Sequence, residues 1–210
     1  MTKDQNIVLS TSYFGPIQYF TKFLFPGQVY LEKYENFTKQ TYRNRCRILG
    51  ANGPLSLTVP VKRGSFHKVK ISELEIEYQY PWQENHWRSI ESAYRSSPFF
   101  EFYQEEIQSL FELKSQLLLD LNFEILRVIL GLLRINRKID FTENYCTSGY
   151  RHDFRDSIHP KKRIEDPLFK PVEYVQVFQP KFGFQTNLSV LDLLFNTGPD
   201  AKAILENSTV

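Results

Sequence analysis

The chain has 210 residues, 41% of them hydrophobic, and its 18 Phe, 12 Tyr and 2 Trp side chains can bury a large apolar core. Its net charge of +2 is too small for a general nucleic-acid binder. Two distant cysteines, Cys46 and Cys146, argue against a disulfide scaffold. We therefore expect one domain over residues 1–210, with no nucleic-acid partner.

A strand, a helix and a second strand open the chain. The apolar run Ile7–Thr11 is typical of a buried strand. Gly15-Pro16 predicts the start of a helix that ends at Pro26-Gly27, and Gln28–Glu32 predicts the next strand. Such a unit forms a parallel pair of strands with a right-handed crossover.

The loop from Ser10 to Tyr13 lies at the carboxyl end of the first predicted strand. Anionic ligands bind at this edge in open α/β sheets, so Tyr13 is a candidate substrate-binding residue. No glycine-rich phosphate motif accompanies the loop, and an ordinary turn between strand and helix is the alternative interpretation.

Three arginines alternate along the next predicted strand. Successive side chains of a strand point to opposite faces, so Arg43, Arg45 and Arg47 are expected on one face. Guanidinium groups this close to one another need anionic neighbours. These are either carboxylates of the chain or a bound phosphate or carboxylate ligand. A solvated basic face is the third interpretation.

A reversal at Gly50–Gly53 predicts a hairpin that pairs this strand with Leu55–Val61. The hairpin lies in a basic block, because residues 33–70 contain nine basic residues and one acidic residue. Residues 71–125 reverse the balance, with eleven acidic and three basic residues. This distribution indicates internal charge complementarity together with an anion site.

A further strand and three helices are predicted next. Alternation over Lys68–Glu77 predicts a strand that extends the sheet. Pro81–Arg95 predicts a helix that turns His86 inward, either as a hydrogen-bonded core residue or as an acid–base group. Apolar helices are predicted from Pro98 and over Leu117–Ile135.

Residues 142–171 are polar and lack periodicity, which is typical of a functional loop or lid. Lys161 in this loop is a candidate phosphate ligand. The potential metal ligands of the loop follow no standard spacing, so neither a metal nor another cofactor is expected. These potential ligands are Cys146, His152, Asp153 and His159.

The C-terminal part is predicted to contain a strand and two helices. The elements are a strand Tyr174–Phe178, a helix Leu188–Asn196 capped by Asn187 or Ser189 and ended by Gly198, and a helix Pro199–Leu205. Asp192 and Asn196 share a helix face, where they could hold an arginine of the hairpin or a ligand hydroxyl. The predicted fold class is α/β, a mixed sheet with a parallel βαβ start and an antiparallel hairpin, covered by helices.

The chain carries no membrane signal that we can identify. Met1–Ser10 has one lysine and no long apolar run, so no signal peptide is expected. Leu117–Ile135 is interrupted by charged residues and is expected to be a buried helix, not a membrane span. We therefore expect a cytoplasmic protein.

Several of these segments together resemble the WbqC-like family of bacterial proteins. The segments are Tyr13–Ile17, Tyr42–Ile48, Leu57–Val61, His86–Trp87, Ala93–Tyr94, Pro98–Phe100 and, most specific, Asn187–Pro199. They cover nearly the whole chain in order. Asp153–Arg155 with Pro160–Lys162 resembles the shorter form of the family found in Bacteroidetes.

The resemblance implies a role in surface-polysaccharide or O-antigen biosynthesis. A sugar-modifying step there would present a diphosphate, so we expect a transferase acting on an anionic, nucleotide-activated sugar. The expected phosphate ligands are Arg43, Arg45, Arg47 and Lys161, the proton-transfer groups His86 or Asp192, and the other substrate contacts Tyr13, Asn44 and Asn196. A non-catalytic binding or assembly protein of the glycan machinery is the alternative.

Overall fold

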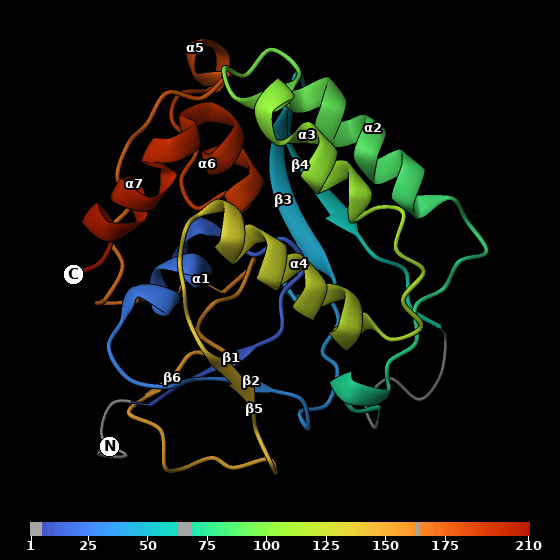
Figure 1. Cartoon of the computed structure of the whole chain (residues 1–210), viewed down its shortest axis with the longest axis vertical. Coiled ribbons are helices and arrows are strands. Elements are labelled where there is room, and N and C mark those ends of the chain that lie inside the picture. The colour runs from blue at the N-terminus through green and yellow to red at the C-terminus, as the bar shows by residue number, and fades with distance from the viewer. Residues whose placement is uncertain (1–5, 63–68, 163) are drawn as a thin grey trace.

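A computed structural model describes residues 6–62, 69–162 and 164–210 (Figure 1). Its parallel sheet has the strand order β5-β2-β1-β6. The four strands are β1 (Ile7–Ser10), β2 (Val29–Glu32), β5 (Ile139–Phe141) and β6 (His152–Asp153). In Figure 1 this sheet occupies the lower part of the molecule, and most of the helices lie above it.

The predicted strand–helix–strand opening is confirmed. β1 and β2 pair in parallel, with Ile7 opposite Val29 and Ser10 opposite Glu32. Between them lies α1 (Ile17–Thr21), which continues as the 3₁₀ turn η2 (Lys22–Leu24). β1 is covered on both faces, which explains why its sequence is a continuous apolar run without alternation.

The arginine-rich hairpin consists of β3 (Arg45–Gly50) and β4 (Gly53–Thr58), which pair antiparallel. Gly53 closes the turn with a φ of 109°, a conformation that favours glycine. Cys46 and Ile48 are fully buried, and Arg45 alternates with them on the half-exposed face. The α/β class is confirmed, with its parallel and antiparallel strands in two separate sheets.

Helices pack on both sheets and on one another (Figure 1). They are α2 (Trp82–Tyr94), α3 (Phe100–Ser109), α4 (Leu118–Leu132), α5 (Gln179–Phe182), α6 (Val190–Thr197), η4 (Gly198–Asp200) and α7 (Ala201–Asn207). α2 packs on β3, while α6 contacts β3, α1, α3 and α7. Within the described residues, no helix has the length and apolar character needed to cross a membrane.

The strand expected over Lys68–Glu77 is wrong for the part of it that is described; Lys68 lies outside the described residues. The segment contains the 3₁₀ turn η3 (Ile71–Glu73) and isolated bridges in place of a continuous ladder. Leu74 and Ile76 alternate with exposed or partly exposed residues because they pack into the core, not because a strand pairs there.

The strand expected over Tyr174–Phe178 is also wrong, because the segment joins no sheet among the described residues. Its alternation has another cause. Tyr174 and Gln176 are buried and donate hydrogen bonds to Asp192 of α6, whereas Val175 between them is 78% exposed. Side-chain hydrogen bonds to a helix therefore produce the strand-like pattern.

Candidate functional site

The carboxyl ends of the parallel strands meet at one edge of the sheet. β2 lies on one side of β1 and β6 on the other, so the strand order reverses at β1. In open α/β sheets, ligands bind in the crevice outside such a switch point. Ser10 ends β1, Glu32 ends β2 and Arg155 follows β6 at this edge.

Arg43 lies before β3 and is buried beside this edge. Its Nε donates to Glu35 Oε1 at 2.7 Å, and its Nη2 donates to Glu35 Oε2 at 2.5 Å and to Ser10 Oγ at 2.7 Å. The expectation that Arg43 shares a strand face with Arg45 and Arg47 is wrong, because Arg43 precedes β3 and is buried, and of the alternative partners a carboxylate of the chain is the one found. A buried guanidinium needs a carboxylate partner, and Glu35 supplies it, while Arg45 and Arg47 remain on the half-exposed face of β3.

Arg155 forms a second buried ion cluster at the same edge. Its Nη1 donates to Glu32 Oε2 at 2.9 Å, and its Nη2 donates to Asp153 Oδ2 at 2.6 Å. Glu32 also accepts a hydrogen bond from Thr142 Oγ1 at 2.8 Å. Ser10 Oγ lies 3.1 Å from the main-chain oxygen of Arg155, so the two clusters touch, and each guanidinium group is paired with carboxylates of the chain.

Two hollows open beside this edge. One, of about 470 Å³, is lined in part by Arg43 and Arg155. The other, of about 570 Å³, is lined in part by Tyr42 and Arg47. A narrow cleft lined by Ser10 shares Tyr42 with the larger hollow and Arg43 with the smaller one. We call the larger one the basic hollow, defined by Arg47, His159, Lys161, Lys162, Thr186 and Asn187.

Cationic side chains dominate the lining of the basic hollow. Arg47 comes from β3, whereas Lys161 and Lys162 come from the loop that follows β6. Asp166 also lines the hollow, but its carboxylate lies 2.6 Å from the buried ammonium of Lys22, which neutralises it. Positive charge therefore remains at the surface of the hollow.

The base of the basic hollow is tied to α1 by amide side chains. Asn187 Oδ1 accepts a hydrogen bond from the main-chain nitrogen of Gln18 at 2.9 Å, and Asn187 Nδ2 donates to Gln18 Oε1 at 3.0 Å. Gln18 Nε2 in turn donates to Asp166 Oδ2 at 2.7 Å. Asn187 has a φ of 54°, which asparagine tolerates better than most residues.

His159 has a defined hydrogen-bonding state in the basic hollow. Its Nδ1 accepts hydrogen bonds from the main-chain nitrogens of Lys161 and Lys162 at 3.0 and 3.1 Å. Partial burial, followed by the charge of Lys162, lowers the pKa of His159. A neutral ring whose Nδ1 accepts must carry its hydrogen on Nε2, so His159 can donate one hydrogen bond to a ligand.

Tyr13 and His86 meet in the core, away from the hollows. Tyr13 Oη lies 2.9 Å from His86 Nδ1, and the two residues are 1% and 6% exposed. Burial lowers the pKa of His86 to about 4, although a hydrogen bond to the backbone of Thr58 opposes the change. Neither side chain lines any of the hollows described above.

Asp192 is 1% exposed within α6. Its Oδ2 accepts hydrogen bonds from Tyr174 Oη at 2.6 Å and from Gln176 Nε2 at 2.9 Å, and among the described residues neither an arginine of the hairpin nor an open face for a ligand hydroxyl is found there. Burial raises the pKa of Asp192. Asn196 Nδ2 donates to the main-chain oxygen of Asp192 at 2.7 Å, so the two residues do not present a joint binding surface.

Asn44 and Arg45 hold the hairpin together. Asn44 Nδ2 donates to the main-chain oxygen of Val59 at 2.9 Å, and Arg45 Nε donates to Thr58 Oγ1 at 3.1 Å. Of the residues expected to bind substrate, the structure brings Arg47 and Lys161 together at the basic hollow.

Sequence reasoning missed the other members of the basic hollow, Lys162, Thr186 and Asn187, and considered His159 only as a potential metal ligand. The polar run around residues 159–162 was the available signal, but the sequence does not reveal that it faces Arg47. Among the described residues, no three or more His, Cys, Asp or Glu side chains converge as a metal site.

Comparisons with known proteins agree with the resemblance noted in the sequence. Residues 11–166 match the model of the WbqC-like protein family, a span that includes Arg47 and the lysines of the basic hollow. The chain is also similar to the uncharacterized protein Rv1507c of Mycobacterium tuberculosis strain H37Rv. The two are 26% identical over 220 residues, which cover 92% of this chain and 94% of the relative. No solved structure matches the chain.

Proposed function

This chain belongs to the WbqC-like protein family, and we propose that it is a transferase acting on an anionic, nucleotide-activated sugar in bacterial surface-polysaccharide biosynthesis. The observation that carries the proposal is the basic hollow, in which Arg47, Lys161 and Lys162 converge from two distant parts of the chain. The proposal places the protein in the cytoplasm.

The chemistry of the hollow suits a diphosphate. A guanidinium such as that of Arg47 binds phosphate oxygens through two parallel N–H groups, and lysine ammonium groups add point charges. The volume of about 570 Å³ lies within the range of roughly 300–1,000 Å³ that small-molecule sites occupy. A nucleotide-activated sugar therefore suits this hollow both in charge and in size.

The proposal uses different residues from those that the sequence suggested. In the proposal, the neutral ring of His159 donates a hydrogen bond from Nε2–H to a phosphate or sugar oxygen, because Nδ1 already accepts hydrogen bonds from the main chain. Arg43 and Arg155 act as positioning residues, since their guanidinium groups are bound to carboxylates of the chain. His86 and Asp192 stabilise the core around the site.

Isothermal titration calorimetry with uridine, guanosine and thymidine diphosphate sugars tests the proposal. We expect at least one to bind, and we expect Arg47→Gln or Lys162→Gln to weaken it roughly tenfold, because each change removes a charged hydrogen-bond donor. Arg95→Gln, at the exposed C-terminal end of α2, is the matched control and should bind as the unmodified chain does.

Two results would contradict the proposal. If none of the nucleotide sugars binds, the substrate class is wrong. If a nucleotide sugar binds with the same affinity to the Arg47 and Lys162 variants, the basic hollow is not its site. Arg45→Gln distinguishes binding in the hollow from binding to any exposed arginine of β3, because Arg45 lies on the same face of β3 as Arg47 but does not line the hollow.

The alternative function is a non-catalytic binding or assembly protein of the glycan machinery. It is favoured by the burial of His86 and Asp192, which leaves both acid–base candidates outside the hollows. This alternative would be supported if a nucleotide sugar binds but no nucleoside diphosphate is released from it when free or lipid-linked sugar acceptors are present. Release that depends on acceptor would support the transferase.

A further inference from the structure

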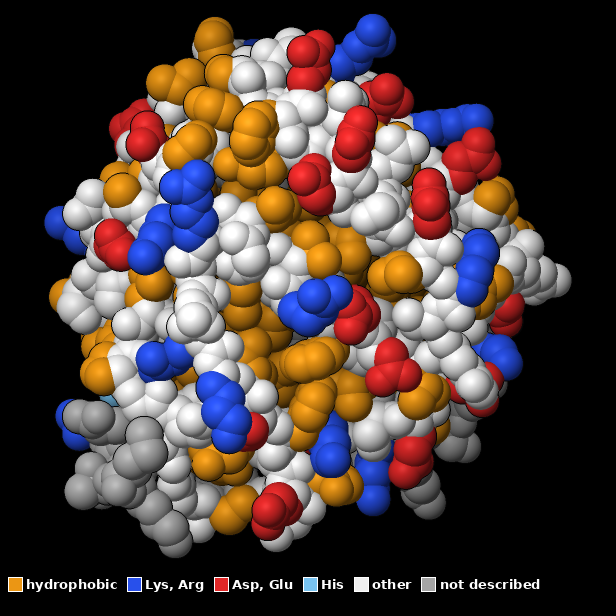
Figure 2. All heavy atoms as spheres, in the orientation of Figure 1, with side chains coloured by type: hydrophobic (Ala, Val, Ile, Leu, Met, Phe, Trp, Pro, Cys, Tyr) orange, Lys and Arg blue, Asp and Glu red, His pale blue; other side chains and the backbone are white. Residues whose placement is uncertain are grey.

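A hollow elsewhere on the molecule differs in chemistry from the basic hollow. It has a volume of about 490 Å³ and lies between the C-terminal half of α4 and the start of β5. Figure 2 shows hydrophobic side chains in the recessed centre of this face, with Lys and Arg side chains around them. We call it the apolar hollow.

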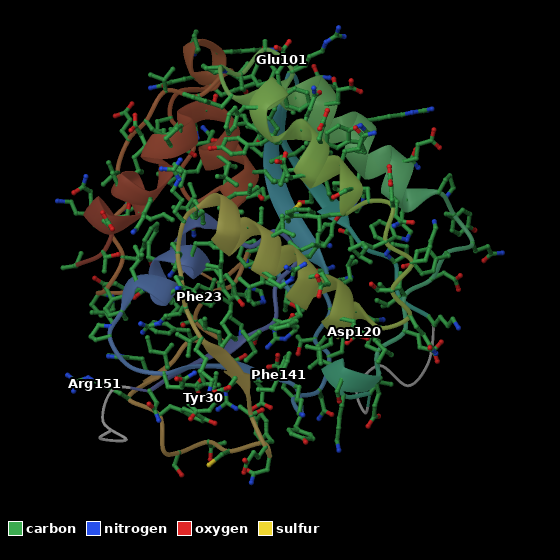
Figure 3. All side chains as sticks on the ribbon, viewed as in Figure 1. Phe23, Tyr30, Glu101, Asp120, Phe141 and Arg151 are labelled. Carbon is green, nitrogen blue, oxygen red and sulfur yellow. The ribbon has the colours of Figure 1, made fainter. Side chains whose placement is uncertain are left out.

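Four of its nine lining residues belong to the hydrophobic core or pack against it. Phe123, Leu130, Ile135 and Ile139 supply the apolar surface. Leu130 and Ile135 are only 4% and 8% exposed. Phe123 is held in place by Phe141 of β5, labelled in Figure 3, with 5.1 Å between the ring centroids. The apolar wall is therefore packed against the core on one side and against β5 on the other.

The charged residues that line the apolar hollow are all arginines, at positions 127, 134 and 137 of the described chain. Arg137 Nη2 donates to the main-chain oxygens of Phe25 and Gly27, so its guanidinium is fixed at the wall. Its Nε is buried and has no hydrogen-bond partner among the described residues. Arg134 is exposed in the turn that follows α4, has a φ of 55°, and makes no salt bridge to any described residue.

Gly131 lines the apolar hollow on the side of α4 and leaves space there. A Cβ atom at this position would meet no atom within 4 Å, and the residue lines the hollow. Glycine is less favourable than alanine inside a helix, so this position gives up some helix stability while leaving the hollow unfilled.

We propose that the apolar hollow binds a single-chain anionic amphiphile, an alkyl chain that carries a carboxylate or phosphate group. The chain would lie against Phe123, Leu130 and Ile139, and the head group would be held by Arg134. An apolar recess favours a hydrocarbon chain, whereas cations without an acidic lining residue select an anionic head group. The site is separate from the basic hollow and does not depend on the function proposed for it.

Calorimetric titration of the full chain with dodecanoate, dodecyl phosphate and dodecanol tests this proposal, with the two anions below their micelle concentrations and the alcohol below its solubility limit. We expect one molecule of either anion to bind per chain. Dodecanol should bind roughly tenfold more weakly because it cannot pair with an arginine. Arg134→Asn, which tolerates the left-handed backbone, should weaken the anions by a similar factor and leave dodecanol unchanged.

Gly131→Phe and Gly131→Ala form a matched pair of variants. The phenyl ring should fill the apolar hollow and abolish binding, whereas the methyl group should leave affinity within about twofold. Gly131→Leu provides a second filling variant, and thermal unfolding checks that each variant is folded.

Several outcomes would overturn the proposal. These are failure of both anions to bind, equal binding of dodecanol, and binding that the folded Gly131→Phe and Gly131→Leu variants retain. Sedimentation with vesicles of anionic phospholipid measures binding to a membrane surface and gives one more result that would contradict the proposal. If the protein binds vesicles but not the monomeric amphiphiles, the face is a membrane-contact surface.

Discussion

Protonation of His86 should destabilise the folded chain in the mildly acidic range. Burial lowers the pKa of His86 from the ordinary 6.5 to about 4. Below about pH 6.5 the unfolded state therefore binds a proton at His86 that the folded state does not bind. The free energy of unfolding falls as the pH falls from there to the pKa of the folded state, about 4. Each pKa unit corresponds to about 1.4 kcal/mol, which limits the full effect to about 3 kcal/mol.

Most of this effect falls between about pH 7 and pH 5, where linkage predicts a loss of about 2 kcal/mol from His86 alone. Urea unfolding followed by circular dichroism, at a series of pH values, measures it. His86→Gln is the comparison, because glutamine keeps a hydrogen-bond acceptor for Tyr13 and does not titrate.

The difference in unfolding free energy between the original chain and the variant isolates His86, because His152, His159 and Asp192 titrate in both proteins. We expect that difference to fall by about 2 kcal/mol from neutral to mildly acidic pH. A difference that does not vary with pH would refute the reasoning, because it would mean that His86 titrates alike in the folded and unfolded states.

Three further predictions concern packing, charge and capping. Gly198→Ala should destabilise the fold by about 2 kcal/mol or more, measured by urea unfolding, because Gly198 has a φ of 55° and a methyl group would overlap the ring of Phe99. Glu35→Gln should lower the unfolding free energy by about 3–5 kcal/mol, because it leaves the buried guanidinium of Arg43 without a carboxylate; an unchanged melting temperature would contradict this. Ser189→Ala should cost about 1–2 kcal/mol in the same assay, since Ser189 Oγ caps α6 and also donates to a main-chain oxygen.

Elements defined by local periodicity could be predicted from the sequence. The opening βαβ unit, the hairpin and helices α2, α3 and α6 follow from apolar spacing and from Pro, Gly or Ser at their ends, whereas α4 follows from apolar spacing alone. Alternation was less reliable where burial had a cause other than strand pairing. Tyr174 is the example, because its burial depends on Asp192, which lies 18 positions away.

The candidate site could be predicted only in part. The charge pattern indicated an anion site and named Arg47 and Lys161, which do line the basic hollow. The charge pattern could not show that Arg43, unlike Arg47 and Lys161, is not free to bind a ligand. Arg43 is paired with Glu35 through tertiary packing, which no sequence spacing indicates. The apolar hollow left no signal, since Gly131 within a helical pattern does not reveal the space beside it.

The buried ion pair between Lys22 and Asp166 has a consequence for how a ligand would enter the basic hollow. Lys22 is fully buried, its ammonium lies 4.6 Å from the centroid of the Phe154 ring, and Asp166 sits within the same hollow wall. Moving Asp166 away would leave the charged ammonium of Lys22 buried among aromatic rings without its carboxylate partner, which is strongly unfavourable. We therefore expect Asp166 to keep its position when a ligand binds, so that this part of the wall needs no slow closing step.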